Sequence, residues 1–309
     1  MPTKAEMYAQ MADQVATQLT GSWQEWAGFL TTAARLYKYP FHEQMMIYAQ
    51  RPDATACAEY DLWNEKMGRY VRRGSKGIAL VDDSGDRPRL RYVFDISDTG
   101  TREHSRTPWL WKLEERHMDS VTAMLERNYG IAGNDLPQQL TDVAGKLAGE
   151  YWEEHQQDFR YIVDGSFLED YDELDIEVQF KAAATVSITY ALMSRCGLEP
   201  EQYFSHEDFM PIFDFNTPAV IGALGTAVSQ ANQQVRVQLL GLQQLVVDQG
   251  PVFFQVRFPH PAVLAQGLLR LFGQLQVGNL IIAVLDVRHG ILHGGFSFLA
   301  WLRVHSFGW

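Results

Sequence analysis

The segment at residues 68–78 has the sequence GRYVRRGSKGI, which combines four basic side chains with three glycines. The runs at residues 70–73 and 77–81 are typical of short strands, and the glycines between them permit a tight connection. A polar turn at residues 82–86 leads to a third strand-like run, RLRYVF, at residues 89–94. The sequence therefore predicts a small antiparallel sheet formed from strands that are neighbours along the chain.

The third run carries two kinds of side chain in alternation. Leu90, Tyr92 and Phe94 share one face of the strand, because successive residues point to opposite sides. Arg89 and Arg91 share the other face. We expect the sheet to present this arginine-lined face to solvent.

Two helical patterns precede the sheet. Ser22 and Glu25 form a capping-box pattern at the start of the first helix, which continues with apolar residues at helical spacing. Pro40 fits the first turn of a second helix, and this helix is expected to end at Arg51, which precedes another proline. A shorter helix is predicted at residues 58–67.

These parts together resemble a known DNA-handling module. The matching motifs are FLTTAAR at residues 29–35, YKYPF at 37–41, IYAQRPDAT at 47–55, Trp63, and RYVRRGSKGI at 69–78. In this order they resemble the N-terminal single-strand-DNA-binding domain of ArdC-type antirestriction proteins. The likeness is to the start of the very large helicase/methylase proteins of conjugative elements of Gram-positive bacteria, and it extends more loosely to about residue 234.

The resemblance implies sequence-tolerant binding of single-stranded DNA, in conjugative transfer or in protection of incoming DNA from restriction. It also implies that the chain is the truncated front end of a longer protein of a mobile element, whose helicase and methylase parts lie downstream. We expect single-stranded DNA as the partner, together with a restriction or conjugation protein.

The candidate DNA-binding residues are basic side chains with aromatic rings among them. Cations neutralise phosphates and release counterions, and rings offer a surface on which bases stack. The candidates are Arg69, Tyr70, Arg72, Arg73 and Lys76 in the hairpin expected from the first two strand-like runs, Arg89 and Arg91 on the next strand, and Arg35, Lys38 and Tyr39 around the end of the first predicted helix. The alternative is that the arginines form a solvated strand face and that the aromatic residues belong to the core.

Charge divides the chain into three segments. Residues 1–109 hold 14 Lys+Arg and 14 Asp+Glu, whereas residues 110–234 hold 7 and 22, a balance of −15. The second segment is mainly helical by pattern, with helices expected at residues 112–128, 138–156 and 176–195 and another that begins at Pro218. The fold class is therefore α+β, with helices packed on a small antiparallel sheet in residues 1–109, followed by an acidic helical domain in residues 110–234.

The acidic segment supports an alternative function. Seven carboxylates lie between residues 164 and 177, a density that suggests a divalent-metal nuclease, a DNA mimic, or a solvated linker and helix start. If the chain acts through this segment, it is an acidic protein-interaction or DNA-mimic antirestriction module that binds a protein partner. An acidic domain would also repel DNA at long range, which weighs against the DNA-binding hypothesis.

The sequence contains no motif for catalysis that we recognise. ArdC-type proteins often carry a zinc-peptidase-like domain, but the nearest match to H-E-x-x-H is HEQMM at residues 42–46, where a methionine replaces the second histidine. Phosphate-loop and methyltransferase motifs are also missing. We expect no enzymatic activity, no metal and no cofactor.

Cysteine content and hydropathy bear on location. With only Cys57 and Cys196, the chain lacks a disulfide framework, which favours a reduced cytoplasmic setting. The N-terminus lacks a signal-peptide core, and the most apolar segment, residues 280–302, is interrupted by charged residues and histidines. We therefore expect a cytoplasmic protein without a membrane span.

Residues 235–309 have an anomalous composition. They contain no Lys, Glu, Thr, Tyr, Met or Cys, and they replace the charged amphipathic helix expected from the resemblance. Our hypothesis is that this tail arises from a shifted reading frame or a spurious gene end. The alternative is a genuine apolar subdomain.

Overall fold

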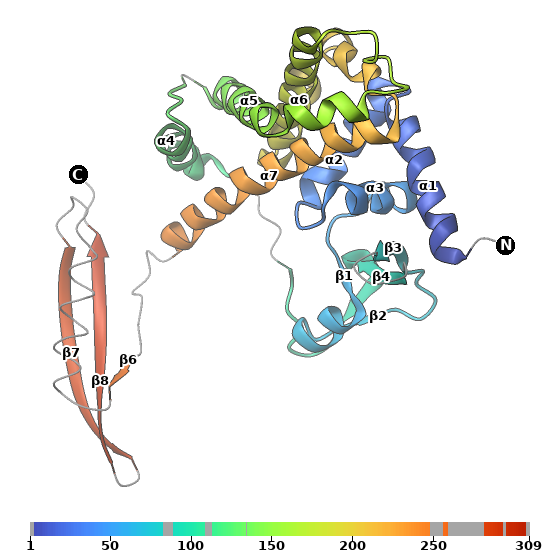
Figure 1. The fold of residues 1–309 in the computed structure, drawn as a ribbon. Coiled ribbons are helices and arrows are strands. Elements are labelled where there is room, and N and C mark those ends of the chain that lie inside the picture. Colours follow the sequence, from blue (N-terminus) through green and yellow to red (C-terminus); the bar gives the residue numbers. More distant parts are fainter. Residues whose placement is uncertain are drawn as a thin grey trace. The chain divides into compact units, whose positions relative to one another are not determined.

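A computed structural model shows two compact units, Met1–Gln238 and Leu239–Trp309 (Figure 1). It describes residues 3–82, 89–108, 113–133, 135–247, 256–258, 281–292 and 295–306, and the side chains of those up to residue 235.

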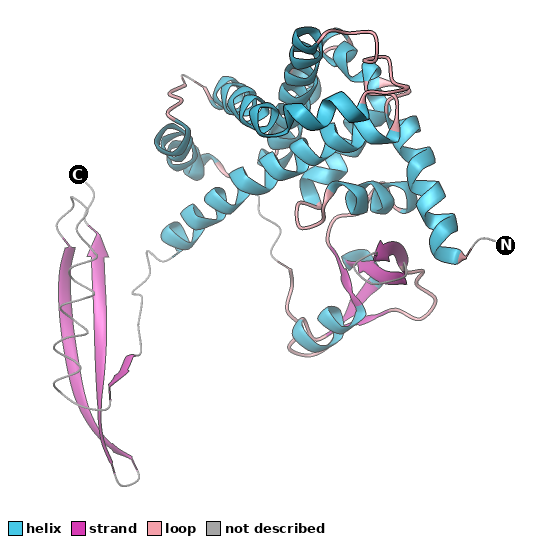
Figure 2. Cartoon of the chain, in the orientation of Figure 1, coloured by secondary structure: helices cyan, strands magenta, loops and turns pink. Residues whose placement is uncertain are grey.

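The first unit is mostly helical, with two small sheets (Figure 2). Its α-helices are α1 (Lys4–Leu19), α2 (Trp23–Arg35), α3 (Phe41–Gln50), α4 (Met118–Tyr129), α5 (Leu136–Ile162), α6 (Glu173–Cys196) and α7 (Pro218–Val247), the last of which continues into the second unit. Its strands are β1 (Cys57–Glu59), β2 (Arg69–Val71), β3 (Ile78–Asp82), β4 (Arg89–Asp95) and β5 (Thr99–Thr101). The shorter helices are η1 (Leu62–Lys66), η2 (Ile96–Asp98), η3 (Glu115–His117), η4 (Pro200–Gln202) and η5 (Glu207–Asp214). The predicted α+β class is confirmed.

The larger sheet has the strand order β1-β4-β3 and is antiparallel throughout, while β2 pairs with β5 in a separate antiparallel ribbon. On the inner face of the larger sheet, Ile78, Leu80 and Val93 pack with Met46 and Ile47 of α3. The free edge of β3 is occupied by the side chain of Gln50, whose amide donates to the Ala79 carbonyl and accepts from the Ala79 N–H, both at 2.9 Å. This contact satisfies backbone groups that an edge strand would otherwise expose.

Helices of the two differently charged segments pack directly against each other. Trp26 of α2 is fully buried, and its Nε1 donates to Ser187 Oγ of α6 at 2.9 Å. In α7, Gly225 lies so close to the ring of Phe41 that a side chain at this position would collide with it. Residues 1–109 and 110–234, which differ in charge, thus share one compact unit.

Several local expectations differ from the structure. The hairpin expected from the runs at residues 70–73 and 77–81 is not formed, since β2 pairs with β5 and β3 pairs with β4. Helix α1 was not predicted, although Thr3 and Glu6 form a complete capping box at its start. The helix expected at residues 58–67 is present only at residues 60–66, largely as the π-helical η1, because Ala58 belongs to β1 and pairs with Phe94, while the indole of Trp63 donates to the Phe94 carbonyl at 2.8 Å. Helix α4 begins at Met118 rather than at residue 112.

The second unit contains β6 (Val256–Phe258), β7 (Ile281–Leu292) and β8 (Gly295–Ser306), which form an antiparallel sheet in the order β6-β8-β7. The reading-frame hypothesis for residues 235–309 stays a prediction, since much of this segment lies outside the described residues. Within the described part of the chain, no helix combines the length and apolarity needed to cross a membrane.

Candidate nucleic-acid interface

The loop between β2 and β3 carries three exposed cations. Arg72 is partly engaged, since its Nη1 donates to the Ser97 carbonyl at 2.8 Å. Arg73 and Lys76 make no hydrogen bond, ion pair or ring contact with any other described residue, and both are exposed. Residues 69–77 contain no carboxylate. The loop therefore presents positive charge that the described protein does not neutralise.

The other predicted cations of the sheet divide between the surface and the interior. Arg69 is buried, and its Nε donates to Thr99 Oγ1 at 2.8 Å. Arg91 lies on the inner face, where it forms ion pairs with Glu43 and, at 3.1 Å, with Glu59. Arg89 is exposed at the start of β4. The expected arginine-lined outer face is therefore absent among the described residues, because the buried Val93 turns its side of β4 inward.

The outer face of β4 is aromatic instead. Tyr92 is 44% exposed, and its ring and that of Phe94 lie against Gly77, where an added Cβ would be 3.1–3.2 Å from both side chains. On β2, Tyr70 is 40% exposed; its ring covers Gly100, its cross-strand partner, and the guanidinium of Arg102 lies 5.6 Å from the ring centre. Two exposed tyrosines therefore border the cationic loop, one at its start and one at its end. Sequence reasoning did not select Tyr92, because alternation alone does not tell which face is buried.

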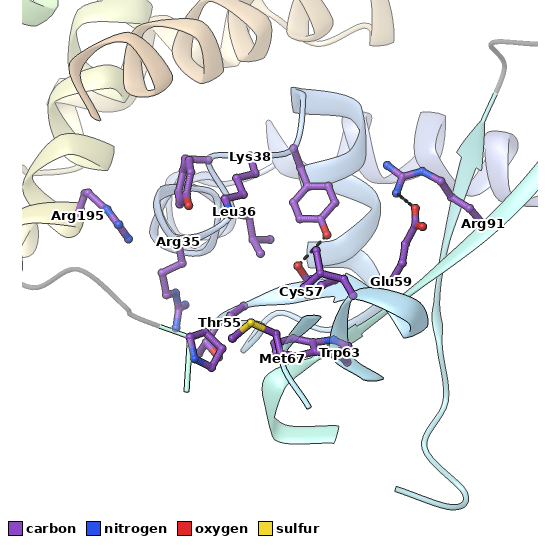
Figure 3. A pocket seen from close by; sticks show the side chains of 16 residues that line it. Arg35, Leu36, Lys38, Thr55, Cys57, Glu59, Trp63, Met67, Arg91 and Arg195 are labelled. Atoms are coloured by element: carbon purple, nitrogen blue, oxygen red, sulfur yellow. Dashed lines mark hydrogen bonds and ion pairs between the residues drawn. The ribbon is translucent and has the colours of Figure 1, made fainter. Parts of the chain in front are cut away.

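A separate pocket of about 500 Å³ lies between the α2–α3 connection, β1, η1 and the end of α6. Figure 3 shows its lining side chains. It collects Arg35, Lys38, Tyr39 and Arg91, four of the predicted residues, and adds Arg195 from the acidic segment. Arg195 was missed because it is more than a hundred residues away in the sequence and no motif marks it.

The charges of this pocket are unequal. Arg35, Lys38, Arg91 and Arg195 line it, whereas Glu59 is its one carboxylate among the described residues and pairs with Arg91. The guanidinium of Arg195 lies 5.3 Å from the centre of the Tyr37 ring, and Lys38 Nζ lies 5.9 Å from the same centre. Burial lowers the pKa of Arg195 from its ordinary value. An anion bound beside the guanidinium of Arg195 would favour its charged form and so oppose that shift of its pKa.

Neutral polar groups form part of the pocket wall. The hydroxyl of Tyr39 donates to the Cys57 carbonyl at 2.9 Å, and burial raises its pKa. Burial, together with the charge of Asp95, also raises the pKa of the Cys57 thiol. Both groups are uncharged at neutral pH, so the positive charge of the wall comes from the arginines and Lys38.

Asp95 anchors the backbone that forms one side of the pocket. Its Oδ2 accepts from the backbone N–H groups of Thr55 and Ala56, at 2.7 and 2.9 Å, and its Oδ1 accepts from the N–H of Ser97 at 2.9 Å. Burial by itself would raise the pKa of Asp95, but hydrogen bonds from Ser97, Thr55 and Ala56 outweigh it and lower the pKa. This carboxylate thus fixes the loop that carries Thr55 and Ala56.

Two carboxylates of the acidic run at residues 164–177 have local structural roles. Asp172 caps α6 by accepting from the N–H of Asp175 at 2.9 Å, and Glu173 pairs with Arg160 at 2.9 Å. Within the ranges the structure describes, no group of three or more His, Cys, Asp or Glu is placed to hold a metal ion.

Comparison with known proteins leaves the family open. No protein-family model, curated protein or solved structure matches the chain.

Proposed function

We propose that this chain binds single-stranded DNA with little sequence preference, as part of a mobile-element protein that acts in conjugation or against restriction. The observation that carries the proposal is the β2–β3 loop, where Arg73 and Lys76 are exposed without partners among the described residues and the half-exposed Tyr70 and Tyr92 lie on either side. Cations beside exposed rings are the combination that holds phosphates and stacks bases.

Single strands suit this surface better than duplex DNA. A base can stack on a tyrosine only when its face is free, and in a duplex that face is covered by the neighbouring pair. The chain carries a formal net charge of −12, so attraction to DNA must be local and short-ranged. The carboxylate-free stretch at residues 69–77 supplies that local attraction.

We expect the double variant Arg73→Gln/Lys76→Gln to weaken binding of a labelled dT oligonucleotide about tenfold or more at 0.1 M salt, because two phosphate contacts are lost. The slope of log affinity against log salt should fall by roughly 0.7 per contact, the value for single strands. Fluorescence anisotropy of the full chain over a salt series measures both quantities.

The matched control is Arg116→Gln/Arg127→Gln, which removes the same charge from exposed positions on η3 and α4. The affinity of this control variant for the oligonucleotide should stay within about twofold of that of the unaltered chain, as expected for charges outside a contact surface. Equal weakening by the two double variants would mean that only net charge matters, and unchanged affinity in a folded Arg73/Lys76 variant would remove the loop from the interface.

A second candidate function, binding of a basic protein partner, is favoured by exposed apolar residues at the α5–α6 connection. Leu174 and Val178 are 67% and 57% exposed on one face of α6, and Phe167 and Tyr161 are exposed beside the acidic run. Acidic groups around exposed apolar side chains fit a partner with a basic, partly apolar binding face.

If this second function operates, the chain should inhibit DNA cleavage by a purified restriction endonuclease. Leu174→Ser/Val178→Ser should then relieve inhibition several-fold, since two apolar side chains that the interface would bury become polar, and burying a Leu or Val side chain is worth about 1.5–3 kcal/mol. Arg73→Gln/Lys76→Gln should leave the inhibition unchanged. Inhibition that instead depends on Arg73 and Lys76 would indicate competition for the DNA.

A further inference from the structure

The pocket has two chemically different ends. In Figure 3, the side chains of Arg35 and Arg195 lie on one side of the view, and the ion pair of Arg91 with Glu59 lies on the other. Arg35 is oriented by its own helix, since its Nε donates to the Thr31 carbonyl at 3.3 Å. Because Glu59 is engaged with Arg91, the end with Arg35 and Arg195 keeps an excess of positive charge.

Between the two ends, the wall is mainly apolar and aromatic. Leu36, Trp63, Met67 and Tyr39 contribute to it. A volume of about 500 Å³ is in the usual range for small-ligand pockets, about 300–1,000 Å³, and is larger than a bare phosphate needs. The volume and lining chemistry therefore suit a ligand that has an anionic end and a weakly polar, aromatic body.

We propose that this pocket binds a single nucleotide, with its phosphate at Arg35, Lys38 and Arg195 and its base along the wall of Tyr39 and Trp63. The nucleotide is either free or the phosphorylated end of a DNA strand, and in the second case the proposal rests on the proposed function and adds a site for the strand end. Arginines hold phosphate oxygens through several N–H donors, and the cationic groups of Lys38 and Arg195 both lie within 6 Å of the centre of the Tyr37 ring.

The pocket is lined by residues from both the N-terminal and the acidic segments, so it needs both segments to be folded together. Arg35 and Lys38 come from the N-terminal segment, whereas Arg195 lies in the last turn of α6. The packing of α2 on α6, which includes the hydrogen bond between Trp26 and Ser187, brings these elements together. The complete chain is therefore the form in which the pocket should be tested.

The test is isothermal titration of the full chain with thymidine 5′-monophosphate, thymidine and inorganic phosphate. We expect the monophosphate to bind at least about tenfold more tightly than either of its parts. Arg195→Gln should weaken it about tenfold, the size expected for one charge-assisted hydrogen bond to phosphate. Lys38→Gln, at an exposed position that should not affect folding, should weaken it roughly threefold. Arg127→Gln, an exposed arginine of α4 outside the lining, is the matched control and should have no effect.

A dT oligonucleotide with a 5′-phosphate, compared with one that has a 5′-hydroxyl, distinguishes the two sources. Displacement of the monophosphate by the phosphorylated strand alone assigns the pocket to strand ends, and displacement by neither assigns it to free nucleotides. No binding of the monophosphate at millimolar concentration, equal binding of inorganic phosphate, or unchanged affinity in both pocket variants would overturn the proposal. If the monophosphate fails to bind but oligonucleotides still bind, the nucleotide pocket is refuted and the DNA-binding function stands. If the monophosphate binds but oligonucleotides do not, the pocket stands and the DNA-binding function is refuted.

Discussion

Trp26→Ala is expected to lower the free energy of unfolding of the chain by about 3–5 kcal/mol, the range found for large buried aromatic residues. Trp26 is fully buried, its ring centre lies 5.3 Å from that of Phe29, and its indole donates to Ser187 Oγ at 2.9 Å. Truncation removes this apolar contact area and leaves a cavity between α2 and α6. Urea denaturation followed by circular dichroism measures the change.

The denaturation curve also shows whether the chain unfolds in one cooperative transition or in two. If residues 3–235 unfold as one cooperative unit, Trp26→Ala should shift far-ultraviolet and fluorescence signals together. Trp23→Ala is a suitable control, because Trp23 is only half-buried and stacks on Phe209 at 5.9 Å, so its loss should cost clearly less. Two separate transitions, of which only one shifts, would show that the N-terminal and acidic segments unfold independently.

Ser187→Ala refines the same experiment. Ser187 accepts from Trp26 and donates to the Ala183 carbonyl at 2.7 Å, so the alanine variant leaves the indole N–H without its partner. A buried N–H without an acceptor should lower the free energy of unfolding by about 1–3 kcal/mol. In the background of Trp26→Ala the serine change should cost much less, and the difference gives the coupling energy between α2 and α6.

Local signals predicted several elements correctly. Ser22 caps α2 as expected, with its Oγ accepting from the N–H of Glu25 at 3.2 Å, and Gly197 ends α6 in the left-handed conformation. These features depend on residues within one turn of each other. Short-range chemistry of this kind can be evaluated directly from a sequence.

The orientation of the sheet could not be obtained in this way. Both faces of β4 carry apolar residues, and the face that is buried is decided by contacts with α3. Arg91 is held inward by Glu43, 48 residues away, and by Glu59, 32 residues away. Neither pairing leaves a local pattern, and the same holds for Arg195 in the pocket. The residue types at the candidate site were therefore accessible from the sequence, whereas their grouping required the tertiary structure.

Asp95→Asn is expected to lower the free energy of unfolding by about 2–4 kcal/mol at pH 7, because charge-assisted hydrogen bonds from several donors are lost and an amide N–H₂ then faces backbone N–H groups. Both carboxylate oxygens of Asp95 act only as acceptors toward Thr55, Ala56 and Ser97. Thr55 and Ala56 lie directly before β1 and line the pocket, so the variant should also weaken the binding of any ligand in the pocket. Asp53→Asn, at an exposed position on the preceding turn, is the matched control and should change stability by less than about 0.5 kcal/mol.

The effect of Asp95→Asn on the free energy of unfolding should depend on pH, which a pure packing effect would not. The hydrogen bonds lower the pKa of Asp95 in the folded chain, so the ionised carboxylate contributes its full stabilisation above the unfolded value of about 3.9 and loses it as the pH falls through the folded value. The difference in unfolding free energy between the unaltered chain and the Asp95→Asn variant should therefore be constant from about pH 7 to about pH 5 and shrink below about pH 4. Urea denaturation of both chains at several pH values measures that difference. A gap that stays constant down to about pH 2 would mean that Asp95 acts through its shape and not through its charge.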